Sequence, residues 1–261
     1  MENKNLGGID KYLNKIILAD YRDIIKDFPD KCIDIILTDP PYGGECEAAE
    51  RGRFKKYESE SFIKARRTGD GWAKKYGSTV KKWNVPPTKE EFEELFRISK
   101  HQIIWGGNYF SMPPTRGFLV WDKLTISENF SMAMAEYAWT NYNQNAKRFA
   151  CMPQDKNRFH PTQKPVKLFD WCLKLHAKPG NIILDNWAGS CTTAISAYKL
   201  GLPFICFENH PEYYEKAVQR FEKFVKEFDE LKRQQQFFNP AEYEQTQLFS
   251  SEEIGESGKA E

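Results

Sequence analysis

Short apolar runs of strand length alternate along the chain with longer stretches in which apolar residues recur at helical spacing. The strand-like runs lie at 13–19, 32–38, 102–105, 117–121, 136–140, 182–185 and 203–208, and the helix-like stretches at 88–99, 162–176, 193–200 and 211–232. Strands that alternate with helices are typical of a doubly wound, mostly parallel sheet. We therefore predict an α/β fold in which ligands bind beyond the carboxyl ends of the strands.

Two stretches lie outside this pattern and set the domain boundaries that we expect. Residues 45–85 form an insertion too polar for a core: eleven Lys and Arg lie between Arg51 and Lys82, against three acids, with five aromatic residues interleaved. Such a stretch can neutralise phosphates and stack on bases, or it can be a solvated loop that its aromatic residues anchor. Residues 233–261 are rich in Gln, Glu and Ser and are expected to be a disordered tail, which leaves 1–232 as a single domain.

Composition narrows the class of protein. The 261 residues are 40% hydrophobic and 29% charged, which favours a globular domain. No apolar run approaches the roughly 20 residues of a membrane span, and no signal peptide is visible, so we expect a cytoplasmic protein without a membrane partner. The six cysteines and four histidines are dispersed, which argues against a metal centre or a disulfide framework. The net charge of +1 does not by itself indicate a nucleic-acid partner.

A strand, a turn of small residues and a helix follow one another over 181–193. Gly189 permits close approach of a ligand to the backbone, and Ser190 and Thr192 are residue types that leave helix N–H groups free for a carboxylate. Glu208 ends the next strand, where an acid meets ribose hydroxyls in dinucleotide-binding folds. From these residues alone, a nucleoside-binding turn and an ordinary α/β turn with an exposed acid are equally consistent with the sequence.

The sequence Asp39-Pro40-Pro41-Tyr42 directly follows an apolar strand and is the most informative motif in the chain. The exocyclic amine of adenine is a poor nucleophile because its lone pair is delocalised into the ring. Hydrogen-bond acceptors on both N–H groups, here the Asp39 carboxylate and the Pro40 carbonyl, would return the lone pair to nitrogen, and the prolines would hold the acceptors rigidly. Tyr42 offers a face on which a flipped-out base can stack. The alternative is a proline-stiffened turn with a surface acid.

These segments resemble those of DNA amino-methyltransferases. Residues 39–42 match the DPPY motif of that family, and 184–194 (LDNWAGSCTTA) resemble its cofactor loop, usually written D-P-F-x-G-S-G-T-T after a strand. Residues 160–165 (HPTQKP) resemble the segment that precedes this loop. The order, with the catalytic motif first, is that of the permuted β group, and the resemblance covers roughly residues 15 to 222. It implies a Rossmann-like methyltransferase fold.

The resemblance also implies S-adenosyl-L-methionine as the cofactor. Glu208 would hold its ribose, Asp20 would contact its adenine, and the Ala188–Ser190 backbone would approach its methionine part. The full set of cofactor-binding candidates is Asp20, Tyr21, Thr162, Lys164, Asp185, Ala188, Gly189, Ser190, Thr192 and Glu208. The chain departs from the family pattern at Asn186, Trp187 and Cys191, where the pattern has Pro, Phe and Gly. We expect the Cys191 side chain to exclude backbone angles open only to glycine.

The aspartate at position 39 favours methylation of adenine N6 over cytosine N4, because the cytosine enzymes of the family more often carry SPPY. It also argues against an RNA or protein-amide substrate, for which related sites carry Asn-Pro-Pro-Tyr. The alternative from another class is a binding protein on the same fold without turnover, which only Cys191 favours. The sequence contains no visible nuclease motif, so it fits a solitary enzyme or the modification half of a restriction system.

The implied partner is double-stranded DNA. The candidate DNA contacts, all in the basic insertion, are Lys55, Lys56, Arg66, Arg67, Lys74 and Lys75. The short segment 141–159 is a second candidate for target reading. In the tail, Gln245–Phe249 (QTQLF) resembles the peptides with which bacterial replication proteins dock on the sliding clamp, which predicts a clamp contact there.

Overall fold

The computed structural model describes residues 8–43, 84–126, 133–153 and 158–238 of the chain. Its residues group into two compact units, Met1–Gln219 and Arg220–Glu261. The basic insertion, with all six candidate DNA contacts, and the clamp-like peptide at 245–249 lie outside the described residues.

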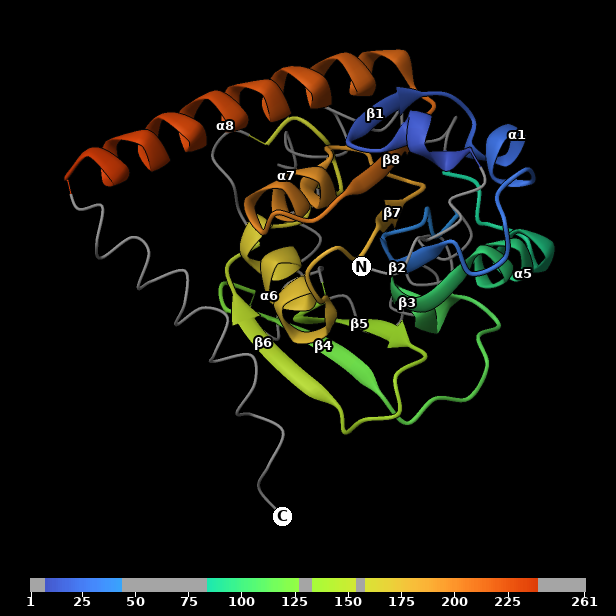
Figure 1. The fold of residues 1–261 in the computed structure, drawn as a ribbon. Helices are drawn as coiled ribbons and strands as arrows, with labels where there is room; N and C mark the ends of the chain where they lie inside the picture. Colours follow the sequence, from blue (N-terminus) through green and yellow to red (C-terminus); the bar gives the residue numbers. More distant parts are fainter. Residues whose placement is uncertain (1–7, 44–83, 127–132, 154–157, 239–261) are drawn as a thin grey trace, which may run out of the picture. The chain divides into compact units, whose positions relative to one another are not determined.

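Eight described strands form one sheet in the order β1-β8-β7-β2-β3-β5-β4-β6 (Figure 1). Their bounds are β1 Lys15–Leu18, β2 Ile33–Thr38, β3 Ser99–Trp105, β4 Phe118–Lys123, β5 Ala135–Thr140, β6 Lys147–Cys151, β7 Ile183–Asp185 and β8 Phe204–Glu208. Every described pairing is parallel except the two that β5 makes with β3 and β4. The doubly wound, mostly parallel α/β fold is therefore confirmed, and β5 alone among the described strands is reversed.

The described helices are α1 Tyr21–Ile25, α5 Lys89–Ile98, α6 Val166–His176, α7 Thr192–Lys199 and α8 Pro211–Phe238, with short 3-10 turns η1 Ile9–Tyr12 and η3 Gly107–Tyr109. Helices α1 and α5 share one apolar cluster with Ile36, Ile104 and Leu184 of the sheet. Successive side chains of a strand point to opposite faces, so the fully buried Leu37 and Ile103 point away from that cluster. Helices α6 and α7 pack together, with α7 against β7 and β8 and α6 against β6.

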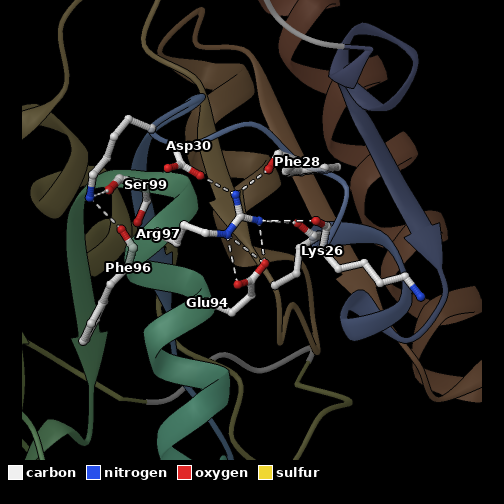
Figure 2. Close-up of polar contacts among 9 residues, drawn as sticks. Lys26, Phe28, Asp30, Glu94, Phe96, Arg97 and Ser99 are labelled. Atoms are coloured by element: carbon white, nitrogen blue, oxygen red, sulfur yellow. Dashed lines mark hydrogen bonds and ion pairs between the residues drawn. The ribbon is translucent and has the colours of Figure 1, made fainter.

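Arg97, near the end of α5, fixes the connection that leads from α1 into β2 (Figure 2). Its guanidinium donates to the Phe28 carbonyl at 2.7 Å and to Asp30 at 2.6 Å, while Glu94 accepts from it on the same helix. Because β2 starts a few residues later, these charge-assisted bonds set where the strand enters the sheet. They belong to the amino-terminal edge of β2, opposite to the edge at which Asp39 follows the strand.

Most predicted elements are present, with instructive differences. A capping box begins α5: the Thr88 hydroxyl accepts from the Glu91 N–H, and the Glu91 carboxylate accepts from the Thr88 N–H. The helix expected from residue 162 begins only at Val166, because a residue before a proline disfavours helical backbone and Lys164 precedes Pro165. Strand β6 and helix α1 were not predicted. Within the described ranges, no helix has both the length and the apolarity that crossing a membrane requires, and no cluster of His, Cys, Asp or Glu is arranged for a metal ion.

Candidate active site

A cavity of about 320 Å³ lies at the carboxyl-terminal edge of the sheet. Parallel strands end at the same edge, so the turns after β2, β7 and β8 converge there although they are far apart in sequence. The cavity is lined by the proposed catalytic residues Asp39, Pro40, Pro41 and Tyr42 and by Tyr21, Thr162, Lys164, Asp185, Ala188, Gly189, Ser190, Thr192 and Glu208. The two motifs that the sequence singled out thus face one space.

The Asp39 carboxylate is held by two side chains. Lys164 Nζ donates to Asp39 Oδ2 at 2.5 Å, and the Tyr42 hydroxyl donates to Asp39 Oδ1 at 2.5 Å. Burial raises the pKa of the Asp39 carboxyl above its ordinary value, and the Lys164 ammonium opposes that rise. Both side chains are almost enclosed, with exposed fractions of 12% for Asp39 and 7% for Lys164. The position and charge of this acid therefore depend directly on Lys164.

Lys164 belongs to a longer row of alternating charges. Its Nζ lies 3.1 Å from Glu136 Oε2, and Glu136 Oε1 lies 2.5 Å from Lys123 Nζ. Burial works to raise the pKa of Glu136, but the two ammonium groups outweigh it and hold that pKa below its usual range. The carboxylates of Asp39 and Glu136 and the ammonium groups of Lys164 and Lys123 together carry no net charge. Buried charges are tolerated when they are paired in this way.

The reversed strand β5 explains how Glu136 reaches this row. Glu136 is the second residue of β5 and pairs with Trp121, so it lies at the edge where the parallel strands end. Lys123 is the last residue of β4 and reaches the same edge. Neither residue was among the sequence-based site candidates. Glu136 starts the predicted strand 136–140 and Lys123 lies two residues beyond the predicted strand 117–121, so a charged residue at the boundary of an apolar strand is the signal that could have identified both.

The ring of Tyr42 is confined by its neighbours. It stacks on Tyr109 with ring centroids 4.6 Å apart and an interplanar angle of 29°. A Cβ placed on Gly106, which has φ of +68°, would lie 2.1 Å from Cε1 of Tyr42, so only glycine leaves room for the ring. Tyr109 also lines the cavity, and the stacked pair therefore supplies an aromatic surface beside Asp39.

Asp185 ties the two motifs together. Its carboxylate accepts from Thr38 Oγ1 at 2.7 Å and from Thr193 Oγ1 at 2.5 Å, which joins the end of β2 to the end of β7 and the start of α7. Burial raises the pKa of Asp185 to about 6, although both hydroxyls lower it. The Trp187 N–H also donates to Oδ1 at 3.2 Å, so three donors from the protein share this carboxylate, and Asp185 acts on the cavity mainly by fixing its neighbours.

Glu208, the last residue of β8, is 8% exposed and borders the cavity. Its Oε2 accepts from the Gly189 N–H at 2.8 Å and its Oε1 accepts from the His210 N–H at 2.8 Å. Burial raises the pKa of Glu208 to about 7, and these N–H groups limit the rise. Each oxygen keeps further acceptor capacity, so the carboxylate can bind hydroxyl donors from a ligand.

The turn from β7 into α7 contains two left-handed residues. Gly189 has φ of +51°, and a Cβ there would lie 3.1 Å from His160 Cε1, so the His160 ring closes one side of the turn. Cys191 has φ of 55° and ψ of 38° and is the N-cap of α7. This left-handed conformation costs an L-residue some strain but is not restricted to glycine.

Two residues at the start of this turn, Trp187 and Asn186, also border the cavity. Trp187 lines the cavity and packs edge-on against Tyr21, with ring centroids 5.0 Å apart. Asn186 also lines the cavity and is 2% exposed. Neither Asn186 Oδ1 nor Asn186 Nδ2 has a hydrogen-bond partner in the described part of the chain. Sequence reasoning noted both positions only as departures from the family pattern.

Asp20 is the exception among the cofactor-binding candidates. It is not among the residues that line the cavity. Instead it is the N-cap of α1, where its carboxylate accepts from the Arg22 backbone N–H and pairs with the Arg22 side chain. The sequence placed Asp20 at the end of a strand and missed the short helix that uses it as a cap.

Comparisons with known proteins identify the family that this chain matches. The sequence model of a family described as DNA methylase (N6_N4_Mtase) matches residues 60–219, more than half of the 261-residue chain. The DNA adenine methyltransferase YhdJ of Escherichia coli (strain K12) is 27% identical over 246 residues, a match that covers 79% of this chain and 82% of that protein.

Solved structures also resemble this chain. The PvuII DNA methyltransferase (cytosine-N4-specific) matches with a TM-score of 0.50 and 14% identity over 81% of this chain and 90% of that one. M1.HpyAVI in its complex with S-adenosyl-L-methionine matches with a TM-score of 0.47 and 21% identity over 79% of this chain and 98% of that one. At these identities the likeness to the PvuII enzyme bears on the fold alone, and there it agrees with the α/β architecture.

Proposed function

The chain belongs to the DNA methylase family of N6/N4 amino-methyltransferases, which depend on S-adenosyl-L-methionine, and we propose that its target is the N6 amine of adenine in double-stranded DNA. One observation carries the proposal: the Asp39 turn and the Gly189 turn with Glu208 line a single cavity. An amine held by Asp39 and a methyl donor held by the Gly189 turn would share that space.

The residues of the cavity fit the proposed cofactor. Glu208 has acceptor capacity left for ribose hydroxyls, and Tyr21 and Trp187 present rings suited to a purine. When bound, the cofactor supplies an electrophilic methyl group on a sulfonium sulfur.

Asp39 performs the central step in this proposal. Its carboxylate would accept one N–H of the target amine and the Pro40 carbonyl would accept the other, which would leave the nitrogen lone pair free to form the N–C bond while the sulfonium sulfur keeps the electrons of the broken C–S bond. Lys164 and Tyr42 hold the carboxylate in one orientation, so little reorganisation is needed when the amine arrives. The methylated amine then loses its proton, and no strong base is required.

Tyr42 and Tyr109 position the base. A base must leave the duplex to reach a cavity of this kind, and unstacking it costs a few kcal/mol. The stacked tyrosine pair beside Asp39 offers aromatic contact that offsets this cost. The basic insertion at 45–85 is the segment that we propose contacts the DNA backbone.

Adenine is favoured over cytosine by the aspartate of the motif and by the likeness to a relative described as a DNA adenine methyltransferase. The rival proposal of a fold without turnover rests on Cys191 alone, and Cys191 holds the left-handed backbone angles at the N-cap of α7 that other residue types besides glycine can adopt. An inactive binding protein would also have no need for the row of buried charges that fixes Asp39.

The test is methyl transfer from isotopically labelled cofactor to unmethylated duplex DNA, followed by nucleoside analysis. We expect N6-methyladenine from the wild type and no product from Asp39→Ala, with cofactor binding retained. Glu136 remains to pair with Lys164 in that variant, which should preserve its fold. Asp27→Ala, at an exposed aspartate, is the matched control and should keep full activity. N4-methylcytosine as the product would overturn the adenine assignment. Cofactor binding without any methylated product would overturn the proposed methyltransferase activity.

A further inference from the structure

Lys164 stands between two buried carboxylates but makes a hydrogen bond to only one of them. Its Nζ donates to Asp39 Oδ2 at 2.5 Å. Glu136 Oε2 lies 3.1 Å from the same Nζ, close enough for an ion pair, but the two atoms are not aligned for a hydrogen bond, and Oε2 has no other hydrogen-bond partner among the described residues. Buried acceptors are rarely left in this state, because they carry the cost of their desolvation. Glu136 therefore offers the Lys164 ammonium a second acceptor.

The carboxylate of Glu136 is fixed in place by groups outside the cavity. Lys123 Nζ lies 2.5 Å from Glu136 Oε1 and 5.1 Å from the centre of the Trp121 ring, so it serves the other oxygen and is itself anchored. Glu136 and Lys123 are not among the residues that line the cavity, whereas Asp39 and Lys164 are. Glu136 can thus act on a ligand in the cavity only through Lys164.

Both oxygens of Asp39 already accept hydrogen bonds from the protein, since Tyr42 donates to Oδ1 and Lys164 donates to Oδ2. An amine that binds to Asp39 must share an oxygen with one of these donors. Of the two, Lys164 has another carboxylate within 3.1 Å. An ammonium on Asp39 also cancels the negative charge that would stabilise the positive charge developing on the amine nitrogen. Binding of the amine therefore favours a different partner for Lys164.

We propose that the Lys164 ammonium moves from Asp39 to Glu136 when the target amine binds, which makes Glu136 a positioning residue for methyl transfer; this inference rests on the function proposed above. The move is a change of hydrogen-bond acceptor. No proton is transferred, and the row of two carboxylates and two ammonium groups keeps a net charge of zero. Asp39 then has the Tyr42 hydroxyl and the amine as its donors, and its negative charge faces the nitrogen that attacks the methyl carbon.

The charged groups around Asp39 set the direction of a measurable pH effect. Burial raises the pKa of Asp39, and the Lys164 ammonium opposes that rise. The Glu136 carboxylate adds to the rise, and the Tyr42 hydroxyl opposes it. Asp185 is a further acid whose charge interacts with that of Asp39. Removing Glu136 while Lys164 stays in place should therefore lower the pKa of Asp39, whereas displacing Lys164 should raise it.

The test is a double variant of the full-length protein, Glu136→Gln with Lys123→Met, which removes the second acceptor and its counter-ion together. The pair of Asp39 and Lys164 that remains is neutral, so no buried charge loses its partner and the protein should fold. We expect single-turnover methyl transfer to duplex DNA, at saturating cofactor and DNA, to slow by about 10- to 100-fold, because the ammonium stays on Asp39. Cofactor affinity, measured by calorimetry, should not change.

The pH profile of the transfer rate separates this role from a structural one. In the double variant the acid limb should move to lower pH, because Asp39 loses the Glu136 charge that raises its pKa. The variant is then slow although Asp39 ionises more readily. Asp170→Asn with Lys199→Met is the matched control, because it removes another ion pair, with an N–O distance of 2.5 Å, from residues that do not line the cavity. Its rate and pH profile should equal those of the wild type.

Glu136→Asp keeps all four charges and should fold even if the double variant does not. Its shorter side chain withdraws the acceptor from Lys164, so its rate should fall between those of the wild type and the double variant.

Several results would overturn the inference. A double variant or Glu136→Asp as fast as the wild type would show that Glu136 serves stability alone. An acid limb that moves to higher pH in the double variant would show that Glu136 only holds Lys164 on Asp39. Glu136→Asp no faster than the double variant would show that the carboxylate is not what matters. If the wild type transferred no methyl group to DNA, the proposed function itself would fail, an outcome distinct from failure at Glu136 alone.

Discussion

Lys164→Met removes the ammonium that binds Asp39 while keeping much of the volume of the side chain. It changes the buried row of charges from neutral to a net charge of −1, because Glu136 and Lys123 still pair but Asp39 loses its cation. Breaking a buried ion pair by removing one partner costs about 3–5 kcal/mol. For a protein of this size each kcal/mol lowers the melting temperature by about 2–4 °C, so we expect a drop of roughly 6–20 °C.

The loss should depend on pH in a definite direction. Burial already raises the pKa of Asp39, and removing Lys164 raises it further. The penalty for an unpaired ionised Asp39 is then fully present above that pKa and is relieved as the pH falls and the carboxyl is protonated. The stability gap between wild type and variant should therefore be largest near pH 8 and shrink towards pH 5. Methyl transfer by the variant should need a higher pH than in the wild type.

Urea unfolding of both proteins between pH 5 and pH 8 measures this gap. Lys216→Met is the matched control, because Lys216 pairs with Glu212 at 2.6 Å on an exposed helix surface. Exposed pairs of this kind contribute about 0.3–0.5 kcal/mol. A Lys164→Met loss as small as that of the control, or one that does not change with pH, would refute the reasoning that Asp39 depends on a buried counter-charge.

Two further predictions concern other parts of the chain. The pKa of Glu208 is raised to about 7, and hydroxyl groups of a bound ligand would lower it. Calorimetry should therefore show cofactor affinity that rises with pH up to about 7 and levels above it. Glu208→Gln should remove this pH dependence. In the absence of ligand, Glu208 contributes stability below its unfolded pKa that is lost as the pH rises through 7. Arg97→Met should cost about 2 kcal/mol in urea unfolding, through its bonds to Phe28 and Asp30 (Figure 2), yet leave cofactor affinity unchanged, because Arg97 does not line the cavity.

The sequence predicted the architecture well where a strand is buried and followed by a distinctive turn. Strand β2 is buried along its whole length, and its apolar run ends at the Asp39 motif as expected. Strand β6 was missed because it is an edge strand with mostly exposed residues, so its composition lacks an apolar pattern. Helix α1 has only five residues, too few for helical periodicity to be visible.

The site was predicted as a set of residues, but its internal contacts were not. Lys164 was predicted as a cofactor-binding residue; it lines the cavity, but its contact with Asp39, which lies 125 residues earlier in the chain, was not predicted. Local patterns indicate which residues stand at strand ends, but the choice of partner among them depends on strand order. In the same way, the unpaired state of Asn186 is a property of packing and has no counterpart in spacing or composition.

The reversed strand β5 lets a residue outside both motifs affect the Asp39 carboxylate. Because β5 begins where its neighbours end, Glu136 enters the row of charges from a hairpin that contains neither of the two motifs. Replacing that hairpin, or changing its pairing by one residue, would alter the proton affinity of Asp39 while leaving every residue of both turns in place. Evolution or design could therefore adjust the working pH of such an enzyme from a part of the chain that is free of its ligands.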